Sequence, residues 1–274
     1  MSTWINGRTG ARIDSRDRGL QYGDGVFETM RVRRAQVRLL DYHLERLFAG
    51  CRQLRIAGPS ARVLRREIER IAALRGEGVL KLIVTRGVST LRGYRPTGRE
   101  RCTRILSLHA LPRVVLTDGA LPARVRLCAT PLGLNPRLAG LKTLNRLESV
   151  VARAEWSDAR IWEGLMRDVD ENIVCGTMSN LFLKRGSFLM TPLLDRCGVA
   201  GVMRRWIMES AAELRLIPVQ RRIGWQELSD AEEVFMSNAV VGLRSVGVIE
   251  RGRERLRRFS FEIANQLRSR LELL

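Results

Sequence analysis

At 274 residues, the chain is long enough to bury one large hydrophobic core or two medium ones, and its 45% apolar content is typical of a globular protein. It contains no run of about 18 uncharged apolar residues that could span a membrane, and residues 1–6 lack the basic start and apolar stretch of a signal peptide. We therefore expect a soluble, cytoplasmic protein with no membrane partner.

The net charge of +19 would suggest nucleic acid as a partner, because clustered basic residues displace counterions from phosphates. The arginines are instead scattered through every segment, and aromatic residues, which would stack on bases, make up only 5% of the chain. Five widely spaced cysteines without a C-x-x-C pair, and two distant histidines, indicate neither a disulfide framework nor a metal site. Composition thus argues against a nucleic-acid binder and a metalloprotein.

The first half of the chain predicts one domain over residues 1–114, in which strands and helices alternate. Asp41 is expected to cap the helix that carries Leu44 and Leu47. Residues 115–122 contain Asp-Gly and end in a proline, which favours a linker. The expected elements are a strand and turn over 4–13, a polar loop at 15–19, a strand at 26–32, helices at 41–54 and 64–72, and strands at 79–84 and 103–108.

The second half predicts a larger domain over residues 123–274. A helix that begins near Gly201 has a first turn without acidic residues, so its free backbone N–H groups could hold an anion. Phe259, Ile263, Leu267 and Leu271 recur at helical spacing and predict a C-terminal helix with a buried face. The other expected elements are a strand at 125–129, a helix at 150–156, a hairpin of 165–168 with 173–175, and strands at 181–183, 188–190 and 233–236.

Lys142 stands out because only three of the 48 basic residues are lysine. Arginine cannot lose its proton in a protein, whereas a buried lysine can give up its proton and attack a carbonyl as a free amine. A lone lysine is more often an ordinary surface residue than a nucleophile. The neighbouring motifs have to decide between these two interpretations.

Four stretches together resemble the fold type IV family of pyridoxal-phosphate enzymes, which holds branched-chain and D-amino acid aminotransferases and aminodeoxychorismate lyases. The resemblance implies an α/β protein of the α+β type, with a small α/β N-terminal domain and a larger C-terminal pseudo-barrel domain that binds pyridoxal 5'-phosphate. It also implies a homodimer. The four stretches are residues 22–29, 43–47, 142–146, and 179–182 running into 191–192 and 201–204.

Within this family, residues 87–94, 103–107 and 138–142 are most similar to the aminodeoxychorismate lyases. The resemblance implies a lyase that converts 4-amino-4-deoxychorismate to 4-aminobenzoate and pyruvate for folate synthesis. An aminotransferase for branched-chain or D-amino acids on the same fold is the alternative.

The resemblance also implies roles for individual residues. Lys142 would form the Schiff base to the cofactor, and Thr29 would assist proton transfer. Arg92 and Tyr94 would bind the substrate. Two alternatives stay open: Thr29 could be an ordinary strand threonine, and Arg92 and Tyr94 could belong to an exposed loop without this role. The residues implied to bind the cofactor phosphate are Arg46, Val202, Met203, Ser237, Asn238 and Ala239.

Cys175 departs from the family pattern. Most members have a glutamate five residues before the Asn of Asn-Leu-Phe, and this glutamate keeps the pyridine nitrogen of the cofactor protonated. A thiol does this less well, which penalises transamination more than an elimination that is driven by forming an aromatic ring. Glu171 or a water could compensate for the missing carboxylate.

Overall fold

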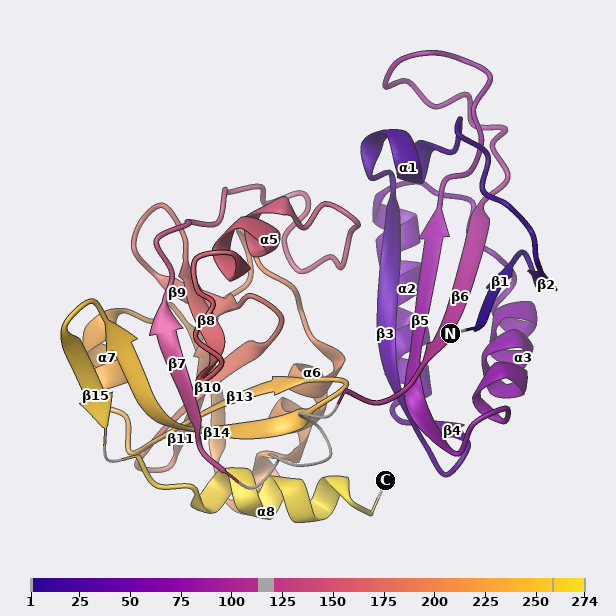
Figure 1. Ribbon diagram of the computed structural model, residues 1–274. Coiled ribbons are helices and arrows are strands. Elements are labelled where there is room, and N and C mark those ends of the chain that lie inside the picture. Colours follow the sequence, from indigo (N-terminus) through magenta and orange to yellow (C-terminus); the bar gives the residue numbers. More distant parts are fainter. Residues whose placement is uncertain (1, 113–120, 258, 274) are drawn as a thin grey trace. The chain divides into compact units, whose positions relative to one another are not determined.

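The computed structural model describes residues 2–112, 121–257 and 259–273, which form two compact units (Figure 1). The first unit contains Met1–Arg113 and the short segment Leu141–Asn145, and the second contains Val114–Gly140 and Arg146–Leu274. Strands and helices alternate in both units, which confirms the α/β class. The expected linker lies outside the described residues except for Leu121 and Pro122.

The first unit is built on a six-stranded antiparallel sheet with the order β2-β1-β6-β5-β3-β4. Alternation along β3 turns Val26, Met30 and Val32 toward helices α2 and α3, which cover one face of the sheet and bury it. The elements are β1 (Ser2–Ile5), β2 (Arg8–Thr9), α1 (Arg18–Tyr22), β3 (Gly25–Arg33), β4 (Gln36–Val37), α2 (Leu40–Gln53), α3 (Ala61–Ala72), β5 (Glu77–Thr85) and β6 (Thr103–His109).

Two expectations for the first unit are wrong. The polar loop at 15–19 runs into helix α1, because the Asp17 carboxylate caps it by accepting a hydrogen bond from the Gly19 N–H. The N-cap of α2 is Leu39, and Asp41 lies in the first turn, where its charge complements the helix dipole without capping. Side-chain type thus indicated the start of α2 only to within a few residues, and it did not indicate α1.

The second unit is built on a curled nine-stranded sheet, in the order β12-β11-β10-β13-β14-β7-β8-β9, with β15 beside β14. Strand β9 returns close to β10 and β11, which agrees with the expected pseudo-barrel. Its elements are β7 (Ala123–Leu127), α5 (Leu147–Arg153), β8 (Ile161–Arg167), β9 (Ile173–Gly176), β10 (Asn180–Arg185), β11 (Phe188–Pro192), α6 (Val202–Ser210), the 3₁₀ helix η1 (Ala212–Leu214), β12 (Ile217–Arg221), α7 (Trp225–Ser229), β13 (Glu233–Asn238), β14 (Gly242–Arg251), β15 (Glu254–Arg257) and α8 (Glu262–Leu271).

The expected hairpin of the second unit is confirmed, since β8 and β9 pair antiparallel. Helix α8 buries Ile263, Leu267 and Leu271 as expected, whereas Phe259 is buried just before the helix begins. Within the described ranges, every helix is too short or too polar to cross a lipid bilayer.

Candidate functional site

The Lys142 segment lies along the free edge of β3 at the start of that strand. The Phe27 N–H donates to the Lys142 carbonyl at 3.0 Å, and the Leu144 N–H donates to the Gly25 carbonyl at 3.0 Å. Since Val26 pairs with Thr143, the side chains of Lys142 and Phe27 project from the same face of the sheet. Lys142 Nζ lies 4.2 Å from the centre of the Phe27 ring, so the amine is held by backbone pairing and a ring contact.

The glycines of the 22–29 motif are explained by this close approach. Gly23 has a φ of +66°, and a Cβ there would lie 2.3 Å from Asn145 Oδ1. A Cβ on Gly25 would lie 2.6 Å from the Val84 carbonyl oxygen and 2.9 Å from Leu144 Cδ1. A larger residue at Gly23 would displace Asn145 of the Lys142 segment, and one at Gly25 would collide with both β5 and Leu144.

Thr29 shares the face of β3 that carries Phe27, because side chains two residues apart on a strand point the same way. Its partner across the sheet is Lys81, whose Nζ lies 5.4 Å from the Phe27 ring centre. The structure therefore brings Lys142 and Thr29 to one face, as a role in proton transfer requires.

Arg46 is oriented by a buried carboxylate that the sequence reading missed. Its Nε and Nη2 donate to Glu28 at 2.8 and 2.5 Å, and His43 Nδ1 lies 2.5 Å from the same carboxylate. Burial alone would raise the pKa of Glu28, but the Arg46 charge and the His43 hydrogen bond lower it to about 2. Burial lowers the pKa of His43, which favours a neutral imidazole.

The sequence did contain a signal for the buried position of Glu28, because this acidic residue stands among the apolar residues of one face of a strand. It occupies the buried face of β3 between Val26 and Met30, where an unpaired charge would be costly. Its partners come from α2, one of the two helices that pack on this face, and they are Arg46 and His43.

The second unit supplies a site suited to an anion at the start of α6. Gly201 precedes the helix without a side-chain cap in the described structure, and the first turn contains no acidic residue. The hydroxyl of Ser237, which is 1% exposed, has no hydrogen-bond partner among the described residues. A buried, unpaired hydroxyl on the strand that α6 packs against fits a ligand oxygen.

The loop before α6 is held at fixed distance from the sheet. Asn180, which pairs with Ser237, donates from Nδ2 to the Val199 carbonyl at 2.8 Å. A Cβ on Gly201 would lie 2.1 Å from Asn180 Oδ1, so glycine is required there. Gly140 pairs with the same loop, donating to the Gly198 carbonyl and accepting from the Ala200 N–H. Val202 and Met203 therefore have a preset backbone in the first turn of α6.

The Asn238 side chain stabilises the turn that follows β13. Its Oδ1 accepts the N–H groups of Val240 and Val241 at 3.0 and 2.8 Å, which shapes the turn after β13. Asn238 and Ala239 are half-buried in this turn, so they can present backbone groups rather than the Asn238 amide.

Cys175 is buried in β9, and burial raises the pKa of its thiol to about 12. The group is therefore uncharged at neutral pH. Glu171 does not replace the missing carboxylate, because its side chain is 71% exposed and pairs with Arg167.

Glu163 is a second buried acid that the sequence reading missed, and it organises the turn after Cys175. Its carboxylate accepts the backbone N–H groups of Gly164, Thr177 and Met178 and the hydroxyls of Thr177 and Ser179. Burial raises the pKa of Glu163 against the effect of these donors. Its position in an otherwise buried strand was again the available signal.

Arg92 and Tyr94 lie on the exposed loop between β5 and β6. Tyr94 is 84% exposed, and its ring lies 5.5 Å from that of Tyr22 in a tilted arrangement. The loop thus presents a cation and a phenol outward, in the same unit as Lys142.

Comparisons with known proteins agree on one family. The family model described as amino-transferase class IV matches residues 25–249. An aminodeoxychorismate lyase of Vibrio harveyi is 32% identical over 247 residues, which is 90% of this chain and 90% of the relative. The crystal structure of 4-amino-4-deoxychorismate lyase from Pseudomonas aeruginosa is 44% identical, covers 97% of this chain and 98% of its own, and has a TM-score of 0.91. A hypothetical aminotransferase from Mycobacterium tuberculosis in a PLP-bound form shares the fold at 20% identity, with a TM-score of 0.85 over 99% of this chain and 98% of its own.

We expect Gly23→Ala to lower the free energy of unfolding by on the order of 3 kcal/mol, because the new methyl both strains the backbone and displaces Asn145. Gly10→Ala is the matched control, with a φ of +70° and no described atom within 4 Å of the added Cβ. It should cost only about 1 kcal/mol of backbone strain. Urea unfolding of both variants measures the difference, and equal losses would contradict the close approach.

We expect the free energy of unfolding to fall on acidification, with a contribution from Glu28. Its folded pKa of about 2 lies below the ordinary 4.5, so its stabilisation is complete above pH 4.5 and is lost as the pH falls toward 2. Protonation of Glu28 lowers the free energy of unfolding by on the order of 3 kcal/mol.

His43 further lowers the free energy of unfolding below about pH 6.5, because the histidine of the unfolded chain takes up a proton at a higher pH than the buried one. Glu28→Gln should flatten the acid limb in urea titrations, whereas Glu69→Gln, an exposed control, should leave it unchanged.

Proposed function

Since the chain belongs to the amino-transferase class IV family, we propose that it is a lyase that converts 4-amino-4-deoxychorismate into 4-aminobenzoate and pyruvate. The observation that carries this proposal is the 44% sequence identity to the Pseudomonas aeruginosa lyase, with a TM-score of 0.91 over 97% of this chain. The fold type IV expectation is confirmed by the same match. An aminotransferase on this fold is the weaker alternative.

The cofactor is pyridoxal 5'-phosphate, and the residues present fit it. In the second unit, the α6 amides of Val202 and Met203 and the unpaired Ser237 hydroxyl offer neutral donors for a phosphate, joined by the Asn238–Ala239 backbone. We propose that Arg46, oriented by Glu28, supplies the positive charge for that phosphate, and that Lys142 is the attachment point. When bound, the cofactor withdraws electrons from the carbon that bears the substrate amine.

Lys142 is the proposed general base. Its Nζ removes the proton from the ring carbon that bears the amine, and the carbon–oxygen bond to the enolpyruvyl group breaks as the ring becomes aromatic. Lys142 or Thr29, which project from the same face of β3, then supplies the proton that completes pyruvate. Arg92 pairs with a substrate carboxylate, and the Tyr94 hydroxyl is a second polar contact.

The reaction is favoured over transamination by Cys175. We propose that this residue lies toward the pyridine nitrogen, as the corresponding glutamate does in the family. Its uncharged thiol cannot stabilise a protonated nitrogen as a carboxylate would. Elimination depends less on a protonated pyridine nitrogen, because formation of the aromatic ring supplies much of the favourable free energy.

We also propose that the enzyme works as a cytoplasmic homodimer in folate synthesis. The homodimer is supported by the family resemblance, and sedimentation of the purified protein measures it.

We expect Lys142→Arg to abolish turnover and the visible absorbance of the bound cofactor, because a guanidinium stays protonated and cannot form the covalent link. The test is formation of 4-aminobenzoate from 4-amino-4-deoxychorismate by the purified protein without any 2-oxo acid. Lys184→Arg is the control, since Lys184 pairs with Glu232 near the surface. A wild-type protein that requires a 2-oxo acid acceptor would instead be an aminotransferase, and an active Lys142→Arg protein would refute the assignment of Lys142.

We expect Cys175→Glu to gain side transaminase activity, because the carboxylate would favour a protonated pyridine nitrogen. Cys175→Gln, which is similar in size but uncharged, should not gain it. Transfer of the amino group to a 2-oxo acid measures the activity, and the cofactor absorbance reports the change in protonation separately. If neither quantity changes in Cys175→Glu, the proposed position of this side chain is wrong.

A further inference from the structure

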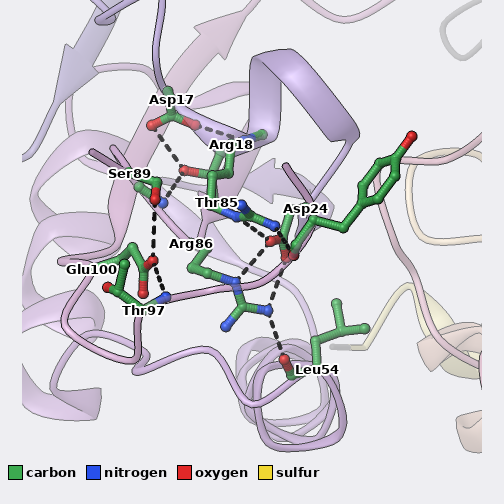
Figure 2. Close-up of polar contacts among 12 residues, drawn as sticks. Asp17, Arg18, Asp24, Leu54, Thr85, Arg86, Ser89, Thr97 and Glu100 are labelled. Carbon is green, nitrogen blue, oxygen red and sulfur yellow. Dashed lines mark hydrogen bonds and ion pairs between the residues drawn. The ribbon is translucent and has the colours of Figure 1, made fainter. Parts of the chain in front are cut away.

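A buried ion-pair cluster in the first unit joins the chain around Gly23–Gly25 to the end of β5 (Figure 2). The Asp24 carboxylate accepts from Arg18 Nε at 2.8 Å and from Arg86 Nε and Nη2 at 2.7 and 3.0 Å. Burial would raise the pKa of Asp24, but the two guanidinium groups lower it. Arg86 also donates to the carbonyls of Leu54 and Arg55, so it ties this cluster to the end of α2.

Arg18 extends this cluster to the loop between β5 and β6. Its Nη1 donates to the Gly93 carbonyl at 3.0 Å and its Nη2 donates to the Tyr94 carbonyl at 2.7 Å. The guanidinium also lies 4.8 Å from the centre of the Tyr22 ring, which packs against Tyr94. The Arg18 side chain is only 4% exposed, and all three of its nitrogens are bound within the protein, so it is not itself available to a ligand.

The rest of the loop is also held by hydrogen bonds. Glu100 accepts the N–H groups of Thr97 and Gly98 and the hydroxyl of Ser89, three contacts that close the far side of the loop. At its base, Asp17 accepts the hydroxyl of Thr85 (Figure 2). It also accepts the hydroxyl of Thr103. A loop with this many internal contacts presents its exposed side chains in a defined arrangement.

The same cluster is joined to the Lys142 segment through two residues. Asp24 lies between Gly23 and Gly25, where an added Cβ would lie 2.3 Å from Asn145 Oδ1 and 2.9 Å from Leu144 Cδ1, respectively. Arg18 therefore stands between two proposed functional elements, with Asp24 on the side of the reactive amine and the Gly93 and Tyr94 carbonyls on the side of the substrate loop.

We propose that Arg18 is a positioning residue that fixes the substrate loop relative to Lys142, so that Arg92 and Tyr94 meet the carboxylate end of the substrate. This inference rests on the proposed lyase function. Arg18 acts through the backbone of residues 93 and 94 and touches neither substrate nor cofactor. The planar fork of arginine is required, because one group has to bind a carboxylate and two carbonyls at once.

Arg18→Met should raise the KM for 4-amino-4-deoxychorismate by about tenfold or more while kcat falls by less than about threefold, because binding is lost without change at the reacting atoms. Arg18→Lys should behave in the same way, since an ammonium group can retain the ion pair with Asp24 but cannot also bind both the Gly93 and Tyr94 carbonyls. Arg16→Met is the matched control, because Arg16 forms an exposed pair with Asp14 two residues away. The cofactor absorbance and the half-saturating cofactor concentration should stay at wild-type values in all three.

The rate of tryptic cleavage measures local opening of the loop and does not require an activity assay. Arg92, Arg99 and Arg101 are exposed cleavage sites within it, and cleavage after them requires local opening. Arg18→Met should be cut faster there than wild type and Arg16→Met should not. Faster cleavage with no conversion of 4-amino-4-deoxychorismate by wild type would overturn the lyase function and leave the anchoring of the loop intact.

A double-mutant cycle with Arg92→Met tests whether Arg18 acts through the loop. If it does, Arg18→Met should raise KM by less than about twofold in the Arg92→Met background. Full additivity of the two effects, or an unchanged rate of loop cleavage in Arg18→Met, would overturn the positioning role. A large loss of cofactor affinity in Arg18→Met would also overturn it, because that would show a general structural role.

Discussion

The pairing of residues 142–144 with the start of β3 is the constraint on which the rest of the first unit depends. Two backbone hydrogen bonds fix the height of Lys142 on the sheet, and the two-residue alternation of strands fixes the face from which its amine projects. Gly23 and Gly25 are small because this segment passes over them. The Lys142 amine is thus placed by main-chain geometry, which substitutions of surface side chains leave intact.

Buried or largely buried carboxylates organise the hydrogen-bond networks inside both units. Glu28 orients Arg46, Asp24 joins two arginines, and Glu163 gathers five donors around the turn after Cys175. Each of these acids is stabilised by several charged or backbone donors, as burial of a charge requires. Glu28 and Asp24 therefore determine where guanidinium groups lie in the first unit, whereas Glu163 orders a turn of the backbone in the second.

Most of the strands and helices were predictable because they leave local patterns in the sequence, whereas α7 and the strands β4, β12, β14 and β15 were not expected. Alternation identified β3 and β5, and the scarcity of lysine pointed to Lys142. Glu28, Glu163 and Arg18 were missed because each depends on at least one partner that is distant in sequence. These partners include Arg46 for Glu28, Ser179 for Glu163 and the Tyr94 carbonyl for Arg18. Helix α1 was missed because Asp17 and Gly23 define it through cap geometry rather than through apolar periodicity.

The first unit is discontinuous in sequence, since Leu141–Asn145 reaches it only after Val114–Gly140 has contributed to the second. On the ribosome, the sheet of the first unit emerges with the edge of β3 still unpaired, and its last strand-like partner is synthesised about thirty residues later, a delay of seconds at ordinary elongation rates. During this interval the exposed edge offers main-chain groups to any extended chain. The first unit is therefore completed by the segment that carries Lys142, and only after Val114–Gly140 of the second unit has been synthesised.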